Sequence, residues 1–147
     1  MRKYICIGCG GFIGAILRYL IKGIKISGYH ENIPLNTLLI NVSGAFIMAL
    51  ILTAALELWA LNSDIRLGIT TGFLGAFTTF STLCKEIAGL LYQGDYFSAI
   101  SYLTLSTVLG LGAAYLGIAA AREICSKYVR EKEEKMSKII EKESEAD

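Results

Sequence analysis

Four long apolar stretches divide this chain, and short polar connections separate them. The stretches cover residues 4–24, 34–58, 67–91 and 98–121. A helix needs about 20 mostly apolar residues to cross the hydrocarbon core of a membrane, and each stretch is long enough. The connections contain glycine, asparagine or aspartate, as turns usually do, and they cover residues 25–33, 62–66 and 93–96. The pattern therefore predicts an all-α membrane protein with four transmembrane helices.

Composition and charge agree with this class of protein and also predict a separate tail. Hydrophobic residues make up 54% of the chain and the mean hydropathy is +0.52, which is too apolar for a soluble domain. Charges crowd into the last 26 residues, where opposite signs recur four positions apart, as in solvated helices. We predict a transmembrane channel domain over residues 1–121 and a charged cytoplasmic tail, helical or frayed, over residues 122–147. A partner-binding tail is the alternative.

Lysine and arginine are almost evenly distributed between the two sets of loops. Because the excess of these residues normally marks the cytoplasmic side, the sequence assigns no clear orientation. A chain with so little bias is able to insert both ways.

Two motifs that carry chemistry in soluble proteins are interpreted as packing features here. The C-x-x-C motif at residues 6–9 lacks the second pair or the nearby histidines that a metal site needs. The glycine cluster at residues 8–14 lacks the preceding strand and the spacing of a dinucleotide-binding loop. Small residues four apart, such as Gly10 and Gly14, instead let membrane helices approach closely. We predict neither enzymatic activity nor nucleic-acid binding.

The third apolar stretch is unusually polar at its centre. Residues 72–83 read GFLGAFTTFSTL, in which glycines and two pairs of hydroxyl residues replace the expected aliphatic side chains. Irregular backbone at membrane depth is tolerated only where protein or water surrounds it. We therefore predict a third helix that is broken at its centre. The freed carbonyls can hold a cation, and the freed N–H groups or hydroxyls can hold an anion.

Polar side chains on the neighbouring helices complete a candidate pore lining. Such residues at membrane depth usually face protein or a water-filled path, although packing alone also explains the hydroxyl stripe on the fourth helix. The lining comprises Thr37, Asn41, Thr79, Phe80, Ser81, Tyr102 and Ser106. It contains no carboxylate and no lysine, which argues against a proton-coupled pump. Amides, hydroxyls and ring edges are donors toward an anion, and neutral donors permit both entry and release.

Lys85 and Glu86 follow the third motif. We interpret them as an ion pair at the membrane edge or as charges that extend to the interface.

Three sequence blocks resemble the CrcB/Fluc fluoride channel family over roughly residues 8–120. They are GGFIGAILRY at 10–19, NTLLINVSGAF at 36–46 and GFLGAFTTFSTL at 72–83, the last close to the family's G-F-x-G-x-x-T-T-F-S-T-F. The resemblance implies an antiparallel, dual-topology dimer of two oppositely oriented subunits. It also implies two fluoride pores and a structural sodium ion (Na+) at the break of the third helices.

The resemblance assigns roles to individual residues. The backbone carbonyls of Gly75 and Thr78 would bind sodium, and each subunit would contribute both. Asn41 would be the pore amide and Phe80 the first pore aromatic. Tyr102 and Ser106 would belong to a polar track, while Arg18 would lie at a water-filled vestibule.

The sequence departs from the family pattern at three positions. Leu83 stands where the family has its second pore phenylalanine. Asn36 and Ala49 are smaller departures, each at a position where a glycine is usual, and neither threatens the predicted fold. An aliphatic Leu83 offers no electropositive ring edge. Either a homodimer conducts with one aromatic, or the chain pairs with a related subunit that supplies the other.

The sequence thus predicts a passive, fluoride-selective channel in the plasma membrane that lowers cytoplasmic fluoride. The first alternative is a pore-completing subunit of a heterodimeric fluoride channel. The second is a subunit of a small multidrug exporter, which needs a carboxylate in its first helix. Residues 4–24 contain none.

Overall fold

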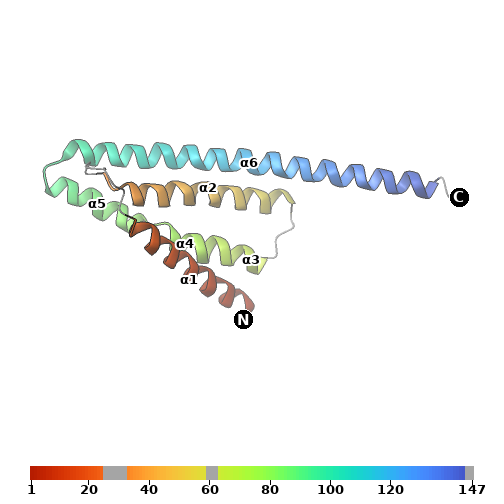
Figure 1. Cartoon of the computed structure of the whole chain (residues 1–147), viewed down its shortest axis with the longest axis horizontal. Helices are drawn as coiled ribbons and strands as arrows, with labels where there is room; N and C mark the ends of the chain where they lie inside the picture. The colour runs from red at the N-terminus through yellow and green to blue at the C-terminus, as the bar shows by residue number, and fades with distance from the viewer. Residues whose placement is uncertain (25–32, 59–62, 145–147) are drawn as a thin grey trace.

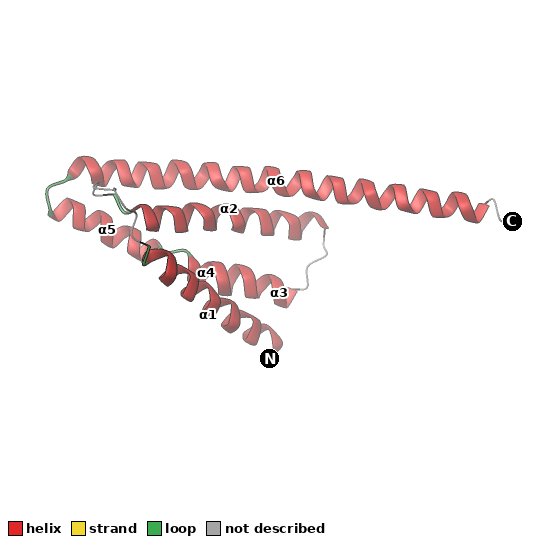
Figure 2. Ribbon diagram, in the orientation of Figure 1, coloured by secondary structure: helices red, strands yellow, loops and turns green. Residues whose placement is uncertain are grey.

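The computed structural model describes residues 1–24, 33–58 and 63–144, apart from the side chains of residue 58 and of residues 139–144. Residues 25–32 of the first predicted connection and residue 62 of the second lie outside these ranges, and residues 63–66, predicted as part of the second connection, are helical instead. The described residues are helical with no strand (Figure 2). The elements are α1 (Arg2–Lys22), α2 (Leu35–Leu58), α3 (Ser63–Leu67), the π-helix η1 (Gly68–Leu74), α4 (Gly75–Phe77), α5 (Phe80–Tyr92) and α6 (Tyr96–Ser144).

Four helical stretches in the described ranges are long and apolar enough to cross a membrane. They are Arg2–Lys22, Leu35–Glu57, Ser63–Tyr92 and Tyr96–Lys138, and they confirm the four predicted spans. α2 lies along α6, and α1 lies along the third span, which runs from α3 through η1 and α4 to α5 (Figure 1). Large apolar side chains cover much of the outer surface, as hydrocarbon surroundings require.

Glycine permits close contact between helices at two interfaces in the described part of the chain. A Cβ atom on Gly10 or Gly14 of α1 would overlap the backbone of η1, and one on Gly72 of η1 would overlap the backbone of α1. Gly117 of α6 meets the backbone of α2 in the same way. These contacts confirm the predicted role of small residues four apart.

The turn between α5 and α6 shows why the chain reverses there. Gly94 adopts a left-handed φ of 78°, and the N–H of Asp95 donates to the carbonyl of Leu90 at 3.0 Å. Asp95 then caps the N-terminus of α6, since its Oδ1 accepts the N–H of Ser98 at 3.1 Å. The turn predicted at residues 93–96 is confirmed.

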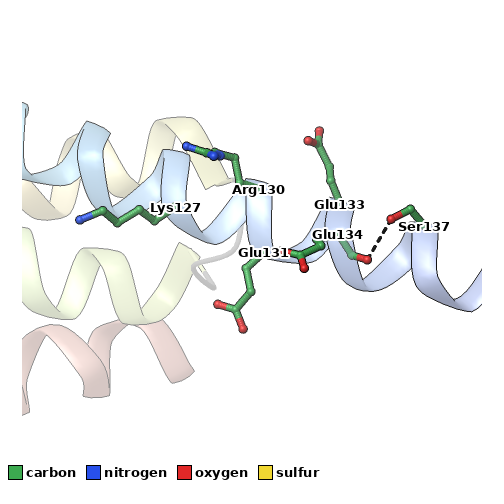
Figure 3. Close-up of a pocket in the computed structure, with 6 residues that line it drawn as sticks. All are labelled: Lys127, Arg130, Glu131, Glu133, Glu134 and Ser137. Atoms are coloured by element: carbon green, nitrogen blue, oxygen red, sulfur yellow. Dashed lines mark hydrogen bonds between the residues drawn. The ribbon is translucent and has the colours of Figure 1, made fainter.

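The charged tail continues the last span as one helix to Ser144, well past the ends of the other helices (Figure 1). Ion pairs four residues apart stabilise its exposed surface, among them Glu131 with Lys135 at 2.6 Å and Glu134 with Lys138 at 2.7 Å. Figure 3 shows a shallow hollow here whose lining residues all belong to this one helix. The hollow is therefore the space between solvated side chains and defines no site.

Candidate functional site

The third span is interrupted at Thr78 and Thr79, between α4 and α5. Thr78 has ψ of 157°, and Thr79 has φ of −149° and ψ of 106°, so both are extended. The helix restarts at Phe80, because the Thr79 hydroxyl oxygen accepts the N–H of Thr82 at 3.2 Å and caps α5. The predicted break thus falls within the glycine- and threonine-rich motif, and only the short helix α4 separates it from the π-helix η1. π-Helical turns are often found at functional sites.

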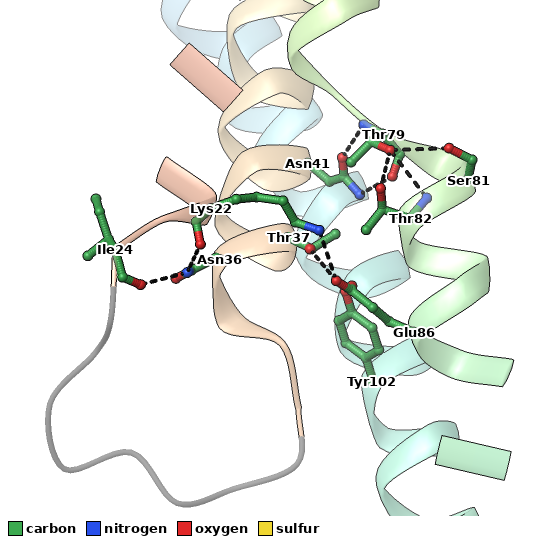
Figure 4. Close-up of polar contacts among 10 residues, drawn as sticks. All are labelled: Lys22, Ile24, Asn36, Thr37, Asn41, Thr79, Ser81, Thr82, Glu86 and Tyr102. Carbon is green, nitrogen blue, oxygen red and sulfur yellow. Dashed lines mark hydrogen bonds and ion pairs between the residues drawn. The ribbon is translucent and has the colours of Figure 1, made fainter. Parts of the chain in front are cut away.

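Asn41 of α2 satisfies the backbone at the centre of this break. Its Oδ1 accepts the N–H of Thr79 at 2.8 Å, and its Nδ2 donates to the Thr79 carbonyl at 3.1 Å (Figure 4). Thr79 is 5% exposed, so water does not replace these bonds easily. The bond to the carbonyl uses one of the two amide hydrogens of Asn41.

At the break, two carbonyl groups lose the hydrogen bonds that they would accept in a continuous helix. In a continuous α-helix, the N–H of Thr79 would bond to Gly75 and the N–H of Thr82 to Thr78. Here those amides donate to Asn41 Oδ1 and to Thr79 Oγ1 instead. The carbonyls of Gly75 and Thr78, the two predicted sodium ligands, therefore lack their usual helical donors.

A second cluster gathers side chains from four spans around the carboxylate of Glu86 in α5. Glu86 Oε1 accepts the Thr37 hydroxyl at 2.9 Å and the Lys22 ammonium at 3.2 Å, and Oε2 accepts the Tyr102 hydroxyl at 2.9 Å (Figure 4). Thr37 and Tyr102 are fully buried. Because a carboxylate only accepts hydrogen bonds, both hydroxyls must donate to it.

This cluster places a carboxylate and a lysine beside Thr37 and Tyr102, two residues of the lining that the sequence predicted to contain neither group. Glu86 does form an ion pair, as interpreted, but its partner is Lys22 of another helix, and it also binds two predicted lining hydroxyls. A signal for this was present in the sequence. Glu86 lies one helical turn after Leu83 and one turn before Leu90, which are both buried, so it shares their face. The two opposite charges leave the cluster formally neutral.

The remaining predicted residues occupy different environments. Phe80 is 78% exposed and Ser81 is also exposed, so both face outward from the single chain. Ser106 lies one turn after Tyr102, and its buried hydroxyl has no hydrogen-bond partner within the described part of the chain. Arg18 is half-buried on α1, and its vestibule role stays a prediction.

A hollow of about 320 Å³ lies beside the break and joins Asn41 to the exposed Phe80. Gly44 of α2 belongs to its wall, where a Cβ atom would overlap the Thr78 side chain. By contrast, Leu83 is only 8% exposed and packs with Leu38 and Tyr102. The substitution at the second pore aromatic therefore lies in the interior of the chain, beside the Glu86 cluster.

Four helices able to span a membrane define a multi-pass membrane protein, and an unwound span with polar groups gathered around it is typical of membrane transport proteins. The family model described as "CrcB-like protein, Camphor Resistance (CrcB)" matches residues 5–118. The chain belongs to this family.

Relatives from several bacteria have similar sequences over nearly their whole length. The chain is 43% identical over 118 residues to the fluoride-specific ion channel FluC of Prosthecochloris aestuarii, covering 80% of this chain and 91% of the relative. It is 40% identical over 124 residues to FluC of Geobacter sulfurreducens, covering 84% and 100%. It is also 40% identical over 134 residues to "Fluoride-specific ion channel FluC 1" of Bacillus anthracis, covering 89% and 97%.

Proposed function

We propose that this protein is a fluoride-selective ion channel that lets fluoride leave the cell passively and so lowers its cytoplasmic concentration. The observation that carries the proposal is the break at Thr78 and Thr79, stabilised by Asn41 at membrane depth. Family membership and relatives named as fluoride-specific channels support the choice of ion.

The predicted lining contains hydrogen-bond donors that can replace the water molecules around a small anion. One amide hydrogen of Asn41, the hydroxyls of Ser81 and Ser106 and the ring edge of Phe80 are neutral donors. Fluoride leaves such a path readily because no uncompensated positive charge holds it. The positive charge of Lys22 is compensated, because its Nζ lies 3.2 Å from Glu86 Oε1.

A structural sodium ion at the break is part of this proposal. The groups present suit it, because the carbonyls of Gly75 and Thr78 lack their helical donors at the negatively polarised end of α4. Gly75 is exposed on the single chain, so a second subunit could approach this residue. The bound ion would supply positive charge that holds two such breaks together.

The proposed assembly is a homodimer of oppositely oriented subunits, with a heterodimer as the alternative. A second copy would cover the outward-facing Phe80, which is 78% exposed beside the break. A pore-completing role beside a related subunit is the second candidate, and Leu83 is the observation that favours it. Relatives numbered FluC 1 and FluC 2 indicate that some organisms carry two such chains.

The function is tested by ion efflux from liposomes that contain only this purified protein. We expect rapid fluoride efflux, followed with a fluoride electrode, and no chloride efflux above that of protein-free liposomes. Comparable chloride efflux would contradict the proposed selectivity. If fluoride efflux requires a co-expressed relative, the homodimer proposal is wrong and the chain is instead a pore-completing subunit of a heterodimer.

Replacing Phe80 by isoleucine should slow fluoride efflux about fivefold, because the loss of an aromatic contact removes on the order of 1 kcal/mol of stabilisation. The substitution retains an apolar side chain but removes the electropositive ring edge. Phe97→Ile is the matched control, since Phe97 is 83% exposed in the first turn of α6, away from the break. Equal efflux from Phe80→Ile and Phe97→Ile would show that Phe80 does not line the pore.

A further inference from the structure

Lys22 is the charged donor of the Glu86 cluster and also its most accessible member. Its side chain is 37% exposed, whereas that of Glu86 is 20% exposed and Thr37 and Tyr102 are fully buried. Lys22 lies in the last turn of α1, at the end of a span. An anion that arrives from solution at this end therefore reaches the ammonium group before it reaches the two hydroxyls.

Asn36 positions the end of α1 that carries Lys22. Its Nδ2 donates to the carbonyl of Ile24 at 2.8 Å and to that of Lys22 at 3.3 Å (Figure 4). The last carbonyls of a helix have no partner within the helix, so this amide fastens the start of α2 to the end of α1. Asn36 is one of the departures from the family pattern, and the glycine usual at that position has no side chain to make these bonds.

The charges of the cluster are arranged so that Lys22 can exchange partners. The ammonium lies 3.2 Å from Glu86 Oε1, which also accepts the Thr37 hydroxyl, while Oε2 accepts the Tyr102 hydroxyl. The Glu86 carboxylate therefore accepts hydrogen bonds from three donors that would also suit a small anion. If the carboxylate moves away, the same three donors face the space that it leaves.

We infer that Lys22 receives the anion at the pore mouth. Asn36 positions Lys22, and Glu86 keeps Lys22 from trapping fluoride. This inference rests on the proposed fluoride channel function. Fluoride displaces the Glu86 carboxylate from the Lys22 ammonium. The ion pair forms again when fluoride leaves for the next part of the pore. Lys22 thereby determines how well the mouth captures fluoride at low concentration, while the neutral lining limits the maximal flux.

The test is the dependence of liposome efflux on fluoride concentration. In Lys22→Met the unpaired Glu86 carboxylate repels anions, so the half-saturating fluoride concentration should rise about tenfold, a modest effect for charges a few ångströms apart near a protein surface. Lys22→Arg should stay close to the unsubstituted protein. Lys85→Met is the matched control, because Lys85 is an exposed lysine adjacent to Glu86 in sequence.

Two further variants test the roles of the neighbours. Asn36→Gly should raise the half-saturating concentration in the same direction as Lys22→Met but less strongly. Glu86→Gln should lower both the half-saturating concentration and the maximal flux, because an uncompensated ammonium holds fluoride. A purely structural role of the ion pair would instead reduce the maximal flux in Lys22→Met and Glu86→Gln alike.

The outcomes separate this inference from the proposed function. If the unsubstituted protein conducts and Lys22→Met has the same concentration dependence as Lys85→Met, Lys22 does not receive the anion. If the unsubstituted protein does not conduct fluoride, the proposed function itself fails. Should Lys22→Met not assemble, as judged by gel filtration, Asn36→Gly and Glu86→Gln still decide, because the inference requires their half-saturating concentrations to move in opposite directions.

Discussion

Replacing Asn41 by leucine is expected to abolish measurable fluoride efflux. The side chain of Asn41 satisfies both the N–H and the carbonyl of Thr79, which is 5% exposed. Leucine is of similar size but bonds to neither group, and each buried group left without a partner costs roughly 1–3 kcal/mol. The break would then lose its geometry, so we expect efflux to fall by about 100-fold or more, as such energies imply.

The control for this variant lies two residues further along the same helix. The Ser43 hydroxyl donates to the carbonyl of Leu39 at 2.6 Å within its own helix, so Ser43→Ala removes a hydroxyl without affecting the break. Efflux from Ser43→Ala should match the unsubstituted protein. If Asn41→Leu conducts as well as Ser43→Ala, the Asn41 amide is needed neither for the break nor for conduction.

Replacing Gly14 by alanine is expected to destabilise the whole bundle. The added Cβ atom would overlap the carbonyl of Phe73 in η1, and because backbone cannot rotate away as a side chain can, α1 must shift. Overpacking of this kind costs about 1–3 kcal/mol, which corresponds to a fall in Tm of about 6 °C for a chain of this length. The measurement is thermal unfolding of the purified protein in detergent, with fluoride efflux as a second readout.

Gly8→Ala separates this packing effect from the general effect of adding a methyl group to α1. A Cβ atom on Gly8 has nothing within 4 Å, so this variant gains helix propensity without a clash. Its Tm should equal or slightly exceed that of the unsubstituted protein. A Gly14→Ala protein as stable as Gly8→Ala would mean that α1 and η1 do not pack this closely.

The sequence alone determined the features that depend on local chemistry. Hydropathy is a local property, so the four spans and the turn at Gly94 were predicted correctly. The break followed from glycine and threonine within one short motif, because these residues weaken a helix wherever they gather. The close helix contacts followed from small residues four apart, such as Gly10 and Gly14.

The tertiary structure alone decided which polar groups meet. Glu86 binds Lys22, 64 residues earlier in the chain, and Thr37, 49 residues earlier, so no local pattern links the three. Asn41 bonds to the backbone of Thr79, and a sequence does not show which backbone groups a break leaves open. Hydrophobicity selects the segments that enter the membrane, but helix packing sets the rotation of each segment. That rotation brought a carboxylate and a lysine beside Thr37 and Tyr102, two residues of the predicted lining.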